Sequence, residues 1–257
     1  MKVLELKKVE HNVKIGDICA DIDPNITEDT LFTFEGKAVG FYLKELEGKI
    51  KQLANVANAE LLSERVPKTE MRRSSGLQNS DFEVTQFSTI IGSCPPKPHM
   101  KRPYPAISSV HQVKSAQTFI KAMILLCKES EKLIQEITPE IYNIQKQIIA
   151  EKVPPKFRFS ELFTSSISNF NISAPFHRDA GNLENCVNVI IAKKENARGG
   201  NTTIPDYSAT VDSRDNSILV YPAWRNVHGV TPIRPTTNGG YRNSLVFYPL
   251  KAFNDYW

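Results

Sequence analysis

The sequence predicts an α+β fold in which helices come first and a β-rich core follows. Stretches with helical spacing precede residue 155, and short runs of β-branched and aromatic residues, separated by Gly, Asn, Asp and Pro clusters, come after it. Many short strands without intervening helices are typical of a sandwich, a jelly roll or a barrel. We therefore expect one integrated domain, with a helical support region over residues 1–154 packed on a β core over residues 155–257.

The composition is that of an ordinary soluble globular protein. Of the 257 residues, 40% are hydrophobic and 23% charged, and the formal charge is +4. This charge is compatible with a polyanionic partner but is too small for a purely electrostatic DNA binder. The four cysteines form no CxxC pair, which argues against zinc ribbons and disulfide frameworks. With no signal-peptide core and no apolar stretch of bilayer length, we expect a soluble intracellular monomer, either nuclear or, for a viral protein, in the host cytoplasm.

Two regions of the N-terminal half have helical period. Residues 41–64 place apolar side chains three and four apart, and residues 115–152 do the same. Pro139 divides the second region, because proline suits the first turn of a new helix. Between the helices lies a basic segment, residues 67–105, rich in Ser and Pro and predicted to be irregular. It is either a solvated loop or a phosphate-contacting one, and its candidates for phosphate contact are Arg72, Arg73, Lys101 and Arg102.

Four runs after residue 155 are predicted strands: residues 163–172, 186–192, 217–223 and 243–250. The first is followed by the motif "PFHRDAGN", in which His177 and Asp179 are two residues apart. This spacing sends both side chains to the same side of an extended segment. A non-haem Fe(II) site needs two imidazoles and one carboxylate on one face of the metal. His228 is the one histidine left after Asp179, so it is the candidate third ligand.

The last predicted strand carries an unusual polar face. Arg242, Ser244, Val246 and Tyr248 share one side of "YRNSLVFYPL", since side chains alternate along a strand. A buried guanidinium needs an anionic partner because an unpaired charge in a core is very costly. A carboxylate held by Arg242 and the Ser244 hydroxyl would satisfy it. A salt bridge to an acidic residue of the protein is the structural alternative.

Residues 160–250 resemble the Fe(II)- and 2-oxoglutarate-dependent dioxygenases of the TET and J-binding-protein branch, which oxidise methylpyrimidines in DNA. The stretches that carry the resemblance are "HRDAGN", the Gly199-Gly200 turn, "VHGVT" and "RNSLVFY". The resemblance implies a double-stranded β-helix (jelly-roll) oxygenase core buttressed by the N-terminal helices. It also implies Fe(II) on His177, Asp179 and His228, with 2-oxoglutarate on Arg242 and Ser244.

The same resemblance implies where a substrate base would lie. Asn182 stands where family members contact the base, and Tyr248 stands where an aromatic ring stacks on it. Two positions depart from the family pattern. Leu250 replaces a histidine that contacts the pyrimidine edge, and Gly181 replaces a histidine before the asparagine. Both departures affect the identity of the base more than the oxygenase chemistry.

The expected reaction is hydroxylation of the C5-methyl group of 5-methylcytosine in double-stranded, methylated DNA, with dioxygen as oxidant. A base inside a duplex cannot reach a recessed iron, so the nucleotide must flip out. Thymine in DNA is the alternative substrate. Two other function classes remain open: a 2-oxoglutarate oxygenase acting on a protein or a free nucleotide, and a non-catalytic binding module. The complete set of metal candidates together with Arg242 and Ser244 argues against the binding module.

Overall fold

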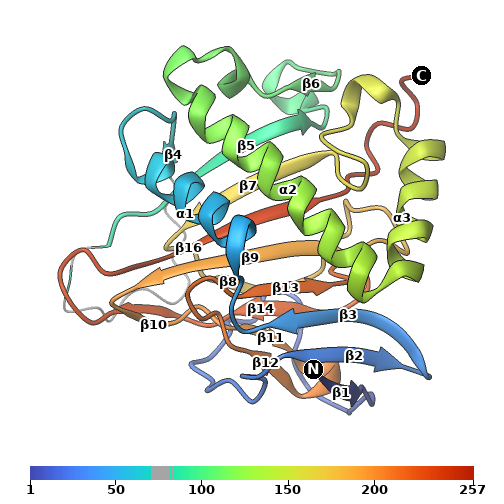
Figure 1. Cartoon of the computed structure of the whole chain (residues 1–257), viewed down its shortest axis with the longest axis vertical. Coiled ribbons are helices and arrows are strands. Elements are labelled where there is room, and N and C mark those ends of the chain that lie inside the picture. Colours follow the sequence, from blue (N-terminus) through green and yellow to red (C-terminus); the bar gives the residue numbers. More distant parts are fainter. Residues whose placement is uncertain (71–81, 83) are drawn as a thin grey trace.

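The computed structural model describes residues 1–70, 82 and 84–257, and its largest element is a ten-stranded β-sheet (Figure 1). The strand order is β1-β2-β3-β13-β9-β16-β7-β5-β4, and β6 pairs with β5. The strands are β1 (Lys2–Glu5), β2 (Thr30–Phe34), β3 (Lys37–Leu43), β4 (Thr69–Glu70), β5 (Phe87–Cys94), β6 (Ala106–Ile107), β7 (Ser165–Phe170), β9 (Asn188–Glu195), β13 (Ile218–Tyr221) and β16 (Tyr241–Tyr248).

A four-stranded antiparallel sheet faces the large one. Its order is β12-β11-β14-β8, with bounds β8 (Ala174–His177), β11 (Thr202–Ile204), β12 (Ala209–Val211) and β14 (His228–Val230). Strands β10 (Ala197–Gly199) and β15 (Ile233–Pro235) form a separate pair. From β7 onward the chain passes repeatedly between the two main sheets, since β7, β9, β13 and β16 belong to the large sheet and β8, β11, β12 and β14 to the small one. This winding is the double-stranded β-helix, or jelly roll.

Three helices cover the outer face of the large sheet (Figure 1): α1 (Gly48–Leu62), α2 (Gln117–Ile137) and α3 (Pro139–Lys152). Apolar side chains of α1 and α2 pack on those of β5, β9, β13 and β16 in one continuous core. A second core lies between the sheets, where Phe32 and Tyr42 meet Ile204 and Val211. The predicted α+β jelly roll with helical buttresses is confirmed. None of the helices in the described ranges is long and apolar enough to span a membrane.

Strand β16 links the helices to the opposite side of the sheet. Tyr241 and Asn243 point to the helix layer, where both hydrogen-bond the side chain of Asn58 on α1. The alternate residues, including Arg242, therefore point to the space between the two sheets. The alternation of side chains that the sequence predicts for this strand is thus confirmed. The strand runs antiparallel between β7 and β9.

The expectation that strands begin only after residue 155 was wrong. Strands β2 and β3 form a hairpin whose turn residues, Glu35 and Gly36, both have positive φ. Residues 87–92 of strand β5 pair with β7, although residues 67–105 were expected to be irregular. The β-branched residues of "FSTIIGSC" are typical of a strand, but the surrounding Ser, Pro and Lys residues led to the prediction of an irregular segment. Helix α1 begins at Gly48 rather than near residue 41, because residues 37–43 form β3, whereas Pro139 opens α3 as predicted.

Candidate active site

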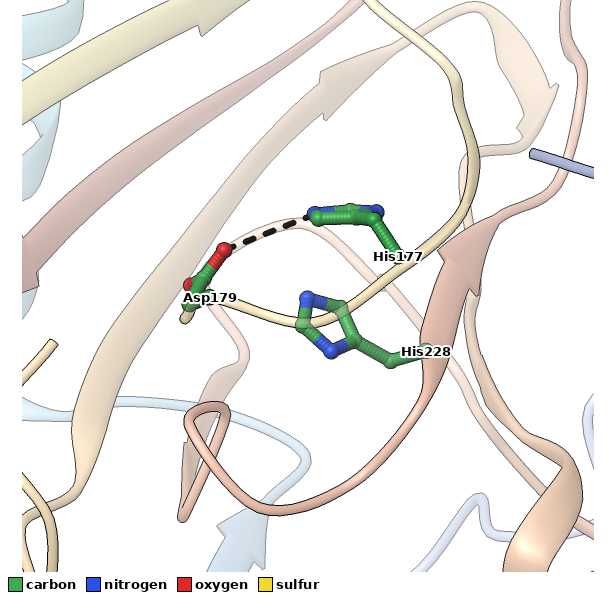
Figure 2. A group of neighbouring side chains, drawn as sticks. All are labelled: His177, Asp179 and His228. Carbon is green, nitrogen blue, oxygen red and sulfur yellow. Dashed lines mark ion pairs between the residues drawn. The ribbon is translucent and has the colours of Figure 1, made fainter. Parts of the chain in front are cut away.

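The structure brings His177, Asp179 and His228 together (Figure 2). His177 ends β8, Asp179 follows it, and His228 begins β14, directly opposite His177 in the strand pairing. One potential ligand atom from each residue lies within 4.8 Å of the others. The two imidazole centroids are 4.2 Å apart, and Nε2 of His177 is 3.5 Å from Oδ1 of Asp179. Two imidazoles and a carboxylate at this separation suit a divalent iron ion.

Hydrogen bonds define which ring nitrogen each histidine offers. Nδ1 of His177 lies 2.8 Å from the carbonyl oxygen of Pro175, and Nδ1 of His228 lies 3.0 Å from that of Asn226. A carbonyl oxygen only accepts, so each Nδ1 carries the proton and each Nε2 keeps a free lone pair. Burial, and then the charge of His177, lower the pKa of His228 to about 4. His228 is therefore neutral near pH 7, as a metal ligand must be.

A chain of two amides holds the carboxylate of Asp179. Nδ2 of Asn188 donates to Oδ2 of Asp179 over 2.8 Å, and Nδ2 of Asn182 donates to Oδ1 of Asn188, also over 2.8 Å. Both asparagines are 4% exposed. The direction of this chain is determined because an ionised carboxylate can only accept. Sequence reasoning missed Asn188, although its alternation with Ile190 in "CVNVII" could have placed it on the inner face of the sheet.

These groups line a cavity of about 530 Å³ between the two sheets. Other lining residues come from the large sheet or follow it, and they include Asn169, Tyr221, Arg242, Ser244, Tyr248 and Leu250. Tyr221 was not singled out from the sequence; its ring packs edge-on against His228, with centroids 5.3 Å apart. Arg242, Ser244 and Tyr248 reach the same cavity as the three candidate metal ligands, which are contributed by the small sheet and its adjoining loop. A co-substrate bound here would contact both sheets.

The guanidinium of Arg242 is buried, and it forms no ion pair with a carboxylate of the described residues. Arg242 is 2% exposed, its Nε has no hydrogen-bond partner, and burial lowers its pKa to about 10. The group therefore stays charged at neutral pH. A Cβ on Gly200, which has a φ of +72°, would lie 3.0 Å from Cγ and Cδ of Arg242, so this glycine leaves room for the arginine stem. An unpaired buried cation requires an anion, and the carboxylate of 2-oxoglutarate fits that requirement.

Tyr248 lies at the other end of the cavity-facing side of β16 from Arg242. Its side chain is only partly exposed, and burial raises its pKa well above the usual range, so its hydroxyl stays protonated. Leu250 also lines the cavity, and its backbone pairs with that of Asn182. The aromatic ring and the amide of Asn182 therefore share one cavity with the candidate metal ligands.

The four basic residues considered for phosphate contact have different outcomes. Arg72 and Arg73 lie outside the described residues. Lys101 is exposed, and Arg102 donates to the carbonyl oxygen of Pro95 over 2.5 Å. Neither of these two lines the cavity. Their role in binding a substrate stays a prediction.

Comparisons with known proteins agree with this site. The family model Tet_JBP, described as the oxygenase domain of the 2OGFeDO superfamily, matches residues 97–251, more than half of the chain. A comparison with curated proteins found no match. Among solved structures, NgTET1 in complex with 5mC DNA is similar, with a TM-score of 0.58 and 12% identity, covering 96% of this chain and 85% of that one.

Two further solved structures are more distant. OsALKBH1 matches with a TM-score of 0.43 and 14% identity, covering 80% of this chain and 96% of its own. A 2OG-Fe(II) oxygenase-family oxidoreductase from Burkholderia pseudomallei matches with a TM-score of 0.41 and 11% identity, covering 82% and 94%.

The family match spans β8, β14 and β16, the strands that carry the candidate metal ligands and Arg242. The family uses Fe(II) and 2-oxoglutarate with dioxygen, and the cavity supplies a metal-binding group and an unpaired buried cation for these two components. This chain therefore belongs to the Tet_JBP oxygenase domains of the 2OGFeDO superfamily, and it is an Fe(II)- and 2-oxoglutarate-dependent dioxygenase of the TET/JBP type.

Proposed function

We propose that this dioxygenase hydroxylates the C5-methyl group of 5-methylcytosine in DNA, acting on a nucleotide flipped out of the duplex. The observation that carries the proposal is the position of Asn182, which lines the cavity that contains the metal-binding group and is held there by its hydrogen bond to Asn188. The family supports the methylpyrimidine class, and the similar structure of NgTET1 is a complex with 5mC DNA.

His177, Asp179 and His228 would hold the iron through Nε2, Oδ1 and Nε2, respectively. Iron bound here would catalyse the oxidative decarboxylation of 2-oxoglutarate to succinate and carbon dioxide. One atom of dioxygen would enter succinate, and the other would enter the substrate as a hydroxyl group. Arg242 would bind the distal carboxylate of 2-oxoglutarate, assisted by the hydroxyl of Ser244 two residues along the same strand face. This ion pair would neutralise a buried guanidinium whose Nε has no hydrogen-bond partner in the described structure.

Asn182 would read the base as cytosine. One N–H of its Nδ2 is engaged by Asn188, so Oδ1, as an acceptor, and the second N–H, as a donor, are left for a ligand. The 4-amino group of cytosine donates, whereas thymine has a carbonyl oxygen at that position. An acceptor facing a carbonyl leaves both unsatisfied, which typically costs about 1–3 kcal/mol. Asn182 would therefore favour 5-methylcytosine over thymine if Oδ1, rather than the second N–H, meets position 4 of the base, and this is the arrangement that we propose.

Tyr248 would replace the stacking that a flipped base loses. The methyl group of a paired base lies in the major groove and cannot enter a cavity between two sheets, so the nucleotide has to leave the helix. Stacking on an aromatic ring contributes about 1–3 kcal/mol per base and does not select the base. Leu250 adds apolar surface at the same end. Arg72, Arg73, Lys101 and Arg102 would then contact phosphates outside the cavity.

The test is direct product analysis. The protein is incubated with Fe(II), 2-oxoglutarate and matched duplexes that contain either 5-methylcytosine or thymine at one position, and the digested nucleosides are analysed by mass spectrometry. We expect 5-hydroxymethylcytosine, with thymine oxidised at least tenfold more slowly. Preferred oxidation of thymine would overturn the base assignment. Turnover of a free nucleotide with no dependence on salt concentration would overturn the assignment of a polynucleotide substrate, whose binding weakens steeply with salt.

A further inference from the structure

The two oxygens of the Asp179 carboxylate have different surroundings. Oδ1 lies 3.5 Å from Nε2 of His177, on the side of the candidate metal ligands (Figure 2). Oδ2 accepts a hydrogen bond of 2.8 Å from Nδ2 of Asn188. Asn188 is the first residue of β9 and is 4% exposed, so the donor side of this bond is buried. The carboxylate is thereby held in one rotation about its terminal bond.

We propose that Asn188 is a positioning residue of the iron site, which occupies Oδ2 of Asp179 and presents Oδ1 alone to the metal. The inference rests on the assignment of His177, Asp179 and His228 as iron ligands in the proposed function. The hydrogen bond from Asn188 takes up one lone pair of Oδ2 and holds the carboxylate with Oδ1 on the side of the two histidines, which favours Oδ1 over Oδ2 as the metal ligand. Asp179 therefore binds through one oxygen rather than two.

Binding through one oxygen matters for the number of open positions. Three protein ligands on one face of an octahedral metal would leave three positions for 2-oxoglutarate and dioxygen. If Oδ2 also bound the metal, it would occupy one of these positions. Asn188 thus keeps a coordination position open, and residues that orient metal ligands typically account for a 10–100-fold change in metal affinity.

Asn182 holds Asn188 in turn. Its Nδ2 donates to Oδ1 of Asn188, which prevents the Asn188 amide from rotating to present its oxygen to Asp179. The backbone of Asn182 also donates to the carbonyl oxygen of Asp179 over 2.9 Å, closing a tight turn around the carboxylate. The amide of Asn182 therefore acts on the metal site through Asn188, in addition to any contact with a base.

The test measures metal binding without DNA. Co(II) replaces Fe(II) in the full-length protein, and its affinity is measured by calorimetry and its geometry by the visible absorption spectrum. We expect Asn188→Ala and Asn188→Leu to bind Co(II) 10–100-fold more weakly and to shift the absorption bands. Asn182→Ala should cause the same spectral shift with a smaller loss of affinity. Leucine has the same branching at Cγ as asparagine but no polar atoms, so N188L reports the lost hydrogen bonds without leaving a cavity.

Asn58→Ala is the matched control. Asn58 is also buried, donates through Nδ2 to the hydroxyl of Tyr241 over 2.8 Å, and accepts from Nδ2 of Asn243 over 2.9 Å, but it lies on the helix side of the sheet. Removing its side chain should lower the melting temperature as much as N188A while leaving the Co(II) spectrum unchanged.

Wild-type Co(II) affinity and an unchanged spectrum in either Asn188 variant would overturn the inference. The same spectral shift in N58A would also overturn it, because the effect would then be general loss of packing. These readings are independent of the substrate. If the enzyme proves to oxidise another substrate, the Co(II) results for the Asn188 variants keep their meaning. Normal Co(II) binding by Asp179→Ala would instead contradict the assignment of the iron ligands.

Discussion

Arg242 on β16 lies opposite Lys194 on the neighbouring strand β9, and the charge of its buried guanidinium acts on the ammonium group of Lys194. Nε of Arg242 has no partner, and Nζ of Lys194 donates to the carbonyl oxygen of Gly199 over 2.8 Å. No carboxylate in the described part of the chain forms an ion pair with either residue. Lys194 lines a neighbouring cavity rather than this one, but its charge acts on that of Arg242, so an anionic co-substrate bound to Arg242 would offset two nearby positive charges.

Replacing Arg242 by methionine should weaken 2-oxoglutarate binding and leave Co(II) affinity nearly unchanged. Losing one partner of a buried ion pair costs about 3–5 kcal/mol, which corresponds to a loss of roughly 100-fold or more in affinity. Without 2-oxoglutarate, the variant should melt at a higher temperature than the wild type, because an unpaired buried charge has been removed. Calorimetric titration and thermal unfolding measure the two effects. Wild-type dependence on 2-oxoglutarate would mean that another residue binds its distal carboxylate.

Affinity for 2-oxoglutarate should fall as the pH rises through about 8. Burial, and then the charge of Arg242, lower the pKa of Lys194 to about 8, while Asp212 and Asp215 act in the opposite direction. A carboxylate near this site favours the charged ammonium, so binding is stronger below this pKa and weaker above it. A shift of one pKa unit corresponds to about a tenfold change in affinity. Titrations from pH 6.5 to 9.5 should show the fall in the wild type and a flat profile in Lys194→Met.

The lowered pKa of Lys194 also affects the stability of the protein without the co-substrate. The pKa of Lys194 is lower in the folded chain than its ordinary value of 10.5, so the unfolded chain binds more protons between pH 8 and 10.5. The contribution of this group to the free energy of unfolding therefore rises with pH across that window. Comparing the pH dependence of the free energy of unfolding for the wild type and Lys194→Met isolates this contribution. A steeper rise in the variant than in the wild type would contradict it.

Asp179→Ala should abolish both tight Fe(II) binding and turnover of 2-oxoglutarate. A methyl group supplies no ligand atom, and the two imidazoles alone leave the metal site incomplete. Metal analysis after gel filtration, together with succinate formation, gives the readout. Asp255→Ala serves as the control, because it removes an exposed acidic residue away from the cavity. A full iron content in D179A would exclude Asp179 as a ligand.

Tyr248→Ala should separate the two half-reactions. We expect oxidation of 5-methylcytosine in DNA to fall by roughly 10–100-fold, in line with the loss of one stacking contact. Decarboxylation of 2-oxoglutarate without substrate should persist, because the metal ligands and Arg242 are untouched. Tyr248→Phe keeps the ring and should retain most of the activity on DNA. If Y248A loses both activities equally, the tyrosine is structural and the base binds elsewhere.

The sequence alone determined the parts of this protein that depend on local order. Alternation along β16 placed Arg242, Ser244 and Tyr248 on one strand face, and Pro139 defined the start of α3, because strand and helix periods are properties of neighbouring residues. The spacing of His177 and Asp179 and the remaining histidine, His228, predicted the metal-binding group only in combination with Arg242 and Ser244 on the last strand. The family resemblance added the jelly roll and the cofactors.

Only the tertiary structure decided how distant strands share the sheets and the cavity. Strands β2, β3 and β5 come from the half expected to be helical or irregular, and pairing with β13 and β7 makes them part of the large sheet. The Asp179–Asn188–Asn182 chain and the neighbouring Lys194 and Arg242 depend on which strands lie side by side. Periodicity gives the face of a strand but not its neighbour, since pairing is determined by long-range burial and register rather than by local sequence.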